Sequence, residues 1–248
     1  MLARTHIVLG LTTALFVANF ITTPYFKGNF DSITLLIIII GALLPDLDMG
    51  TSSLARRFAI LKVKHLQKIW FGILVALATL SFVYLRGTPI FYATIFIIVL
   101  GGFFSKDFAN KGYHVLRNFV QGMVAIGLIA IAYYYQQLPL IGIGTILLLL
   151  LFSKHRGLSH SITFVVIIYY IVKWFCNFYG HDDYSFLFAI IVLSHIIGDM
   201  FTKTGVALFY PLSRKRIKFP YTIKTGGRLE NILFFIACLF VFRLIRLL

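Results

Sequence analysis

Three short strings hold most of the residues whose types and spacing could support chemistry in this chain. They read GALLPDLD from Gly41 to Asp48, HRGLSHS from His155 to Ser161, and SHIIGDMFTKTG from Ser194 to Gly205. Each adjoins an apolar run, and the whole chain has only 8 Asp and Glu and 7 His. A charged side chain at the centre of a bilayer costs about 2.5–3.5 kcal/mol, so buried ones usually have a function. These strings are therefore the first candidates for a functional site.

The first string places two carboxylates just after an apolar segment. Pro45 disfavours the α conformation in the residue before it, which predicts a helix end near Leu44. In an extended segment Asp46 and Asp48 then point to the same side. Two carboxylates aimed together repel unless a cation or a proton joins them. A solvated helix exit is the alternative interpretation.

The second string places two histidines around a glycine, just before a predicted helix. Gly157 allows a sharp bend, so His155 and His160 can converge on one ion. Arg156 between them suits a phosphate oxygen, because a guanidinium presents a fork of N–H donors. Two interfacial histidines near lipid headgroups, with an arginine that is one more surface charge, are the alternative.

The third string stacks a histidine and an aspartate on one helical face. His195 and Asp199 are i and i+4 in an apolar run, the spacing of two-histidine zinc motifs with a carboxylate in place of one imidazole. Ser194, Thr202 and Thr204 flank the pair and could support ligands through hydrogen bonds. A plain His–Asp hydrogen bond and a proton relay are the alternatives.

Two further candidates begin predicted helices near the two ends of the chain. His6 begins the first helix, and Glu230 begins the last, where a carboxylate also complements the helix dipole. If every helix crosses the membrane once, both lie on the same side as the three strings. The opposite side has only Asp31 and the 181–183 run, which form no spaced motif.

A mixed set of His and carboxylate without cysteine suits zinc, manganese or iron. The candidate metal ligands are His6, Asp46, Asp48, His155, His160, His195, Asp199 and Glu230. This set exceeds what one ion uses, so the sequence predicts one or two divalent transition metals, zinc or manganese first. The candidate catalytic residues are Arg156 for a phosphate, and Asp48 or Glu230 as a general base.

The elements that must position these residues are helices in a membrane. The chain has 248 residues, 60% hydrophobic and 12% charged, whereas soluble domains have roughly 45–50% and about 25%. Continuous apolar runs, rather than alternating ones, indicate helices. The predicted fold class is all-α, a polytopic transmembrane bundle of about eight or nine helices, some short or half-spanning. It forms a single domain over 1–248, with inserted helices at about 66–150.

The expected helices follow the apolar runs in chain order. They are Ile7–Thr23, Phe30–Leu44, Ile69–Leu85, Pro89–Phe104, Asn118–Tyr135, Leu138–Phe152, Ser161–Phe178, Ser185–Thr202 and Asn231–Leu248. Between them, 46–68, 105–117 and 203–228 are expected to be connecting loops, and Asp107 and His114 in the second of these are interpreted as loop polarity. The second and sixth helices are the short ones.

The net charge of +15 is distributed unevenly between the two sides of this arrangement. Of the 23 Lys and Arg, 18 fall on the side of the N terminus and the three strings, and 5 on the other. Basic loops face the cytoplasm, which predicts a multi-pass protein of the cytoplasmic (inner) membrane with its N terminus inside. The same rule explains the basic charge without a nucleic-acid partner.

The combination of motifs resembles the YdjM-type family. The shared elements, in order, are THIVLG, GALLPDLD, HRGLSHS, SHIIGDMFTKTGV and GGRLE, and HRGLSHS is the most specific. Members usually have a histidine after the second aspartate of the Pro-Asp-x-Asp motif, where this chain has Met49. The resemblance implies an inner-membrane, metal-dependent hydrolase with a LexA-binding association.

Taken together, these observations favour a membrane-embedded, metal-dependent hydrolase that cleaves a lipid or lipid-linked phosphoester with metal-activated water. Its expected partners are membrane lipids and such a substrate. One alternative is a proton or metal-ion transporter that uses His195 and Asp199. The other is a non-catalytic anchor for a soluble regulator, which would dock on the basic 203–228 loop at the cytoplasmic side.

Overall fold

A computed structural model of the chain describes residues 1–20, 31–48, 61–153 and 156–247, with only the backbone of Asp48. The α-helices in these ranges, in chain order, are α1 (Ala3–Phe20), α2 (Ser32–Leu43), α3 (Val63–Leu85), α4 (Pro89–Phe103), α5 (Ser105–Tyr134), α6 (Pro139–Phe152), α7 (Ile162–Tyr179), α8 (Ser185–Met200) and α9 (Arg228–Ile245). There are also two 3-10 turns: η1 (Pro45–Asp48) follows α2, and η3 (Leu158–His160) precedes α7. The predicted all-helical class is confirmed.

Several helices begin earlier than their apolar runs, α5 and α3 by the most residues. The prediction of a loop at 105–117 was wrong, because α5 begins at Ser105 and continues through this polar stretch. The stretch has no proline that would break a helix. An apolar run shows which part of a helix suits lipid, but it does not show where the helix itself begins or ends. Likewise α3 begins at Val63 rather than at Ile69.

The helices differ in how much of a bilayer they could cross. Four of them, α1, α3, α5 and α7, are long and apolar enough to span a membrane, while α2, α4, α6 and α8 are shorter apolar helices. The 12 residues of α2 rise about 18 Å, which is less than the roughly 30 Å hydrocarbon core. The expectation that some helices are short is confirmed for the second and the sixth.

Contacts between residues divide the chain into two compact units. The main unit comprises Met1–Ala55 and Gly122–Leu248, and the inserted unit comprises Arg56–Gln121. The inserted unit is narrower than the expected insertion at about 66–150, because the second half of α5 and all of α6 belong to the main unit.

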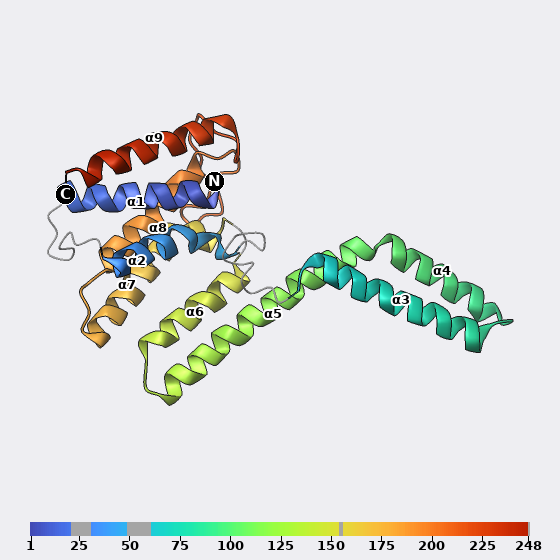
Figure 1. Cartoon of the computed structure of the whole chain (residues 1–248). Helices are drawn as coiled ribbons and strands as arrows, with labels where there is room; N and C mark the ends of the chain where they lie inside the picture. Colours follow the sequence, from blue (N-terminus) through green and yellow to red (C-terminus); the bar gives the residue numbers. More distant parts are fainter. Residues whose placement is uncertain (21–30, 49–60, 154–155, 248) are drawn as a thin grey trace. The chain divides into compact units, whose positions relative to one another are not determined.

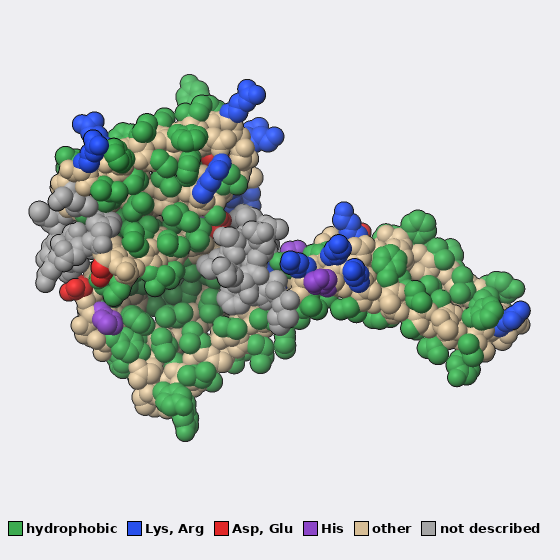
Figure 2. Space-filling view, in the orientation of Figure 1, with side chains coloured by type: hydrophobic (Ala, Val, Ile, Leu, Met, Phe, Trp, Pro, Cys, Tyr) green, Lys and Arg blue, Asp and Glu red, His purple; other side chains and the backbone are tan. Residues whose placement is uncertain are grey.

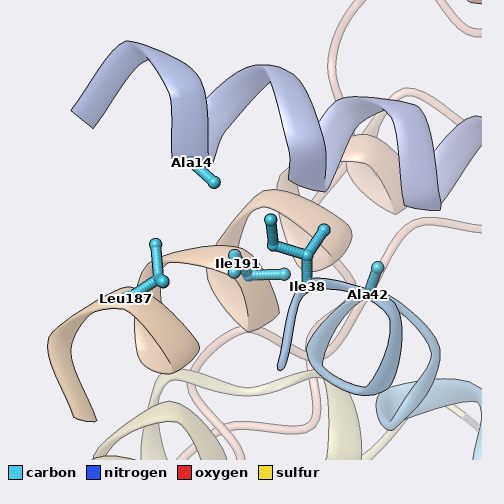
Figure 3. Packing of buried hydrophobic residues seen from close by; sticks show 5 residues of the cluster. All are labelled: Ala14, Ile38, Ala42, Leu187 and Ile191. Atoms are coloured by element: carbon cyan, nitrogen blue, oxygen red, sulfur yellow. The ribbon is translucent and has the colours of Figure 1, made fainter. Parts of the chain in front are cut away.

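The main unit is built around α1 and α8. Helix α1 contacts α2, α8 and α9, and α8 also contacts α2 and α7; in Figure 1, α1 and α9 lie side by side over the others. Figure 3 shows the centre of this packing, where Ala14 of α1, Ile38 and Ala42 of α2, and Leu187 and Ile191 of α8 meet. Small residues at such contacts let helix backbones approach closely.

The inserted unit is a hairpin of α3 and α4 followed by the first half of α5. The Trp70 indole N–H donates to the Gly101 carbonyl at 3.0 Å, and its ring stacks on Phe108. Gly101 leaves room for Leu74, whose side chain would lie 3.1 Å from an added Cβ. The hairpin therefore has a packed seam of its own.

Helix surfaces in both units are largely apolar. Many large hydrophobic side chains are more than half exposed, among them Phe20 and Leu36 in the main unit and Val83 and Phe96 in the inserted one. Figure 2 shows hydrophobic side chains covering much of the visible surface of the helices. Such continuous apolar exposure is unstable in water and stable against lipid, as expected for helices in a membrane.

Candidate metal centre

Four predicted metal ligands come together inside the main unit. Asp46 of η1, His160 of η3, and His195 and Asp199 of α8 are all buried, and one ligand atom from each lies within 4.8 Å of the others. Among the described residues, this is the group of three or more His, Cys, Asp or Glu that could hold an ion. Residues more than 100 positions apart in sequence thus form one compact set of donors.

The Pro-Asp-Leu-Asp string reaches this group by a different conformation from the expected one. Helix α2 ends at Leu43, close to the predicted end, but Pro45–Asp48 forms a 3-10 turn rather than an extended segment. With three residues per turn, positions i and i+2 do not share a face. Asp46 alone is therefore placed in the group by this turn, since the side chain of Asp48 lies outside the described residues.

His195 is oriented by a backbone carbonyl at the end of α2. Its Nδ1 lies 2.6 Å from the carbonyl oxygen of Ala42, which can only accept, so Nδ1 carries the proton. In the neutral ring the Nε2 lone pair then faces the group. Nε2 lies 3.3 Å from Nε2 of His160 and 3.7 Å from Oδ1 of Asp46. An outer hydrogen bond of this kind is how metal-binding histidines are usually fixed.

His160 is held by the turn that the HRGLSHS string forms. Ser159 Oγ lies 2.9 Å from His160 Nδ1, and the His160 Nε2 atom lies 3.7 Å from Oδ1 of Asp46. At the bend, Gly157 has φ −92° and ψ −115°, and Arg156 before it has φ +62°. A left-handed conformation at a non-glycine residue is strained and is often found at functional sites.

Each oxygen of the Asp199 carboxylate has a different set of neighbours. Oδ1 accepts from the Met1 amine at 2.5 Å and lies 3.4 Å from His6 Nε2. Oδ2 lies 3.0 Å from Arg156 Nη2 and 3.3 Å from His160 Nε2. Asp199 is fully buried, and its two oxygens connect Met1 and His6 on one side of the site to Arg156 and His160 on the other.

His6 lies beside the group rather than within it. Its ring stacks on that of His195, with centroids 3.6 Å apart, and both are fully buried. Neither of its ring nitrogens has a hydrogen-bond partner among the residues that the structure describes. Gly198 of α8 lies beside this ring, and a Cβ there would meet it at 3.5 Å, an ordinary van der Waals distance. His6 thus places an available nitrogen next to Oδ1 of Asp199.

Arg156 points toward the protein's own carboxylate and hydroxyl groups. Besides Asp199, its guanidinium donates to the hydroxyls of Thr202 and Thr204 and to the carbonyl of Gly205. The residue is only 8% exposed. The two threonines flanking the third string therefore act through the arginine, whereas Ser194 Oγ bonds back to the Ile191 carbonyl within α8.

Glu230 lies apart from the four-residue group. It is fully buried, and its two oxygens accept from the backbone N–H groups of Leu2 and Gly226, each at 2.6 Å. It thus joins the start of α9 to the start of the chain. His155 lies outside the described residues, so the structure places neither it nor the Asp48 side chain.

Two contributors to the site were not foreseen from the sequence. The Ala42 carbonyl belongs to the last turn of α2, where helix carbonyls lack intrahelical partners, and that position was the available signal. The Met1 amine reaches Asp199 only because α1 packs on α8. Asp31, on the predicted opposite side, is the N-cap of α2, and its bonds from the Thr34 N–H and hydroxyl lower its pKa.

The donor set fits a divalent transition metal. Imidazole nitrogens suit zinc, manganese or iron, and carboxylate oxygens suit the harder of these ions. The Nε2 atoms of His195 and His160 face each other at 3.3 Å, and Asp46 Oδ1 lies 3.7 Å from each, while the cations of Arg156 and of the Met1 amine contact Asp199. A cation among these lone pairs would remove their mutual repulsion.

Comparison with known proteins identifies the family. A family model described as YdjM inner membrane protein matches residues 1–247. No curated protein matches the chain, and no solved structure matches it. The chain therefore belongs to the YdjM family of inner membrane proteins, and the resemblance indicated by the motifs is confirmed.

Proposed function

We propose that this member of the YdjM family is a membrane-embedded, metal-dependent hydrolase of lipid or lipid-linked phosphoesters. The observation that carries the proposal is the buried group of Asp46, His160, His195 and Asp199. Four buried ionisable side chains are costly in an apolar environment unless they bind a ligand or one another. When bound, a divalent metal supplies Lewis acidity and lowers the pKa of a coordinated water toward about 7.

The chain's own residues would have separate tasks in such a site. His195 presents Nε2 because Ala42 fixes its tautomer, and His160 presents Nε2 from the opposite direction. Asp199 supplies a carboxylate that Arg156 holds in place at 3.0 Å. Asp46 has the most exposed side chain of the four, at 11%, so we assign it the position nearest to an entering substrate.

The location of the group supports a second ion as well. His6 Nε2 lies 3.4 Å from Oδ1 of Asp199, on the side away from Arg156. We therefore propose that, if a second ion binds, His6 and Asp199 would hold it.

A lipid substrate agrees with the surroundings of the site. Helices next to the ligands expose large apolar side chains, as at Ile40 of α2, which precedes η1, and at Ile197 of α8. A substrate that approaches along such surfaces has an acyl or isoprenoid portion. Phosphoester cleavage is the reaction that His and carboxylate metal sites support well, and its cytoplasmic side follows from the predicted topology.

The test is metal analysis together with hydrolysis by the purified full-length protein. Freshly extracted protein should contain about one or two zinc or manganese ions per chain. It should also release the headgroup from at least one member of a panel of lipid phosphoesters. His160→Ala and His195→Ala should each lower metal content and hydrolysis together.

His114→Ala is the matched control, because His114 is exposed on α5 and should change neither quantity. Absence of metal from fresh protein would contradict the proposal. Tightly bound metal with no hydrolysis across the panel would contradict the enzymatic part and favour ion transport. Zinc uptake into proteoliposomes that depends on His195 would then identify the transporter.

A further inference from the structure

The segment 203–228, which follows α8 and ends at the start of α9, has cations that the metal centre does not use; we call it the basic cap. It has seven Lys and Arg and no Asp or Glu. All seven of these residues, Lys203, Arg214, Lys215, Arg216, Lys218, Lys224 and Arg228, are exposed. Cations concentrated in this way repel one another, and an anionic partner relieves that repulsion.

Backbone hydrogen bonds give the basic cap a fixed shape. Val206 and Ile217 exchange a pair of bonds at 3.0 and 2.8 Å, and Ile223 N–H donates to the Phe201 carbonyl at 2.7 Å. Gly205 has φ +63°, and a Cβ there would lie 2.6 Å from the Ile217 carbonyl oxygen. The turn therefore needs glycine, and the cations are presented on a folded surface.

The basic cap is attached to the end of a helix that can span the membrane. Ile162 N–H donates to the Leu208 carbonyl at 2.9 Å, and the Thr163 hydroxyl donates to the Tyr210 carbonyl at 2.7 Å. Both donors lie in the first turn of α7, one of the four helices long and apolar enough to cross a bilayer. The cap is thus held against the N-terminal end of α7.

Apolar side chains project from the same surface. Leu212 is 93% exposed and Tyr221 is 89% exposed, among the highest values in the chain. A recess beside them is lined by Phe209, Ser213, Lys215, Arg216, Ile217 and Lys218. In Figure 2, Lys and Arg side chains gather at the end of the main unit where α9 begins, beside hydrophobic side chains. Exposed aromatic and aliphatic groups among cations are typical of surfaces that enter the headgroup region.

We propose that the basic cap binds the anionic phospholipid headgroups of the leaflet that surrounds α7. Lys215, Arg216 and Lys218 would bind headgroup phosphates, and Leu212 and Tyr221 would enter the boundary between headgroups and acyl chains. The charge complementarity and the apolar tips together favour a lipid surface over a soluble acidic partner. This inference does not rest on hydrolysis or on a bound metal.

The experiment places an environment-sensitive fluorophore, NBD, at Leu212→Cys in the full chain reconstituted into nanodiscs. Phosphatidylglycerol replaces phosphatidylcholine stepwise at constant ionic strength. We expect blue-shifted emission and stronger quenching by a headgroup nitroxide lipid as the anionic fraction rises. Labelled parent protein, which keeps Cys176 and Cys238, supplies the background signal, and Tyr221→Cys is a second position should Leu212→Cys not fold.

Lys215→Gln, Arg216→Gln and Lys218→Gln in one chain should abolish the dependence of quenching on the phosphatidylglycerol fraction. The matched control is Lys62→Gln, Lys64→Gln and Lys68→Gln, which removes the same charge from exposed positions at the start of α3. It should leave the response of residue 212 unchanged.

Three results would overturn the inference. One is the same emission in neutral and anionic nanodiscs at both labelled positions. Another is equal loss of the response in the two triple variants, which would reduce it to net charge. The third is reversal by millimolar inorganic phosphate at constant ionic strength, which would indicate a small-anion site instead of a lipid surface.

Discussion

The end of α8 and the beginning of α5 have similar residue types but very different surroundings. On α8, His195 and Asp199 are fully buried and meet donors from η1 and η3. On α5, Asp107 and His114 are both exposed, and they join no group of metal donors among the described residues. Each helix thus pairs one imidazole with one carboxylate, yet a ligand group forms only on α8.

Two physical differences account for this contrast. Residues four apart on a helix share a face within one turn, while Asp107 and His114 are seven apart and lie two turns from each other. In addition, α8 is packed against α1, α2, α7 and η1 within the main unit. Its last turn is therefore enclosed by other segments that also carry polar side chains. The presence of a histidine and an aspartate on one helix does not by itself make a ligand group, because packing of the helix against its neighbours determines which polar side chains are shielded from water.

The largest expected effect is the loss of Asp199. Asp199→Ala leaves the Met1 amine and the Arg156 guanidinium buried without their carboxylate, and breaking a buried pair costs about 3–5 kcal/mol. We expect loss of bound metal and a large decrease in the thermal unfolding temperature, read by metal analysis and by calorimetry in detergent.

Asp107→Ala is the matched variant on α5 and should change neither metal content nor unfolding temperature. Asp199→Asn keeps the shape and one accepting oxygen, and a folded Asp199→Asn protein separates metal loss from misfolding. Full metal content in a folded Asp199→Asn protein would remove this aspartate from the site and with it the contrast between the two helices.

An intermediate effect is expected for Arg156→Lys. An ammonium loses the planar fork that reaches Asp199, Thr202 and Thr204 together. Because the arginine acts on the carboxylate rather than on the ion, metal affinity should fall about 10–100-fold. Competition with a chelator of known affinity measures this change.

A different pattern for the same variant would point to substrate instead. If Arg156 binds a phosphate oxygen, as its position in the sequence suggested, Arg156→Lys should lower turnover while metal affinity stays at the parent value. Unchanged affinity and unchanged turnover would remove the residue from both roles.

The smallest effect is expected for Glu230→Gln. An amide can still accept through its oxygen from one of the two N–H groups, those of Leu2 and Gly226, so the loss is about 1–3 kcal/mol of unfolding free energy. Metal content should remain at the parent value, because Glu230 lies apart from the four-residue group. A loss of one ion per chain would instead place Glu230 among the ligands.

Several features were predictable because they depend on local chemistry. Continuous apolar runs required helices, since only helices and closed barrels satisfy the backbone in lipid. The scarcity of ionisable residues made Asp46, His160, His195 and Asp199 conspicuous, and these four do come together. Pro45 placed the end of α2 near Leu44.

Other features depend on contacts between segments distant in sequence, which spacing does not encode. The division at Gln121 separates two packing groups within one continuous helix, α5. That Arg156 bonds to Asp199 follows from its left-handed backbone and from the packing of the turn on the 202–207 segment. The tautomer of His195 is set by a carbonyl 153 residues away. The sequence by itself determined the residue types, the helices and their polar ends. Only the tertiary structure decided which polar groups face one another, because the orientation of a buried donor depends on the neighbours that exclude water from it.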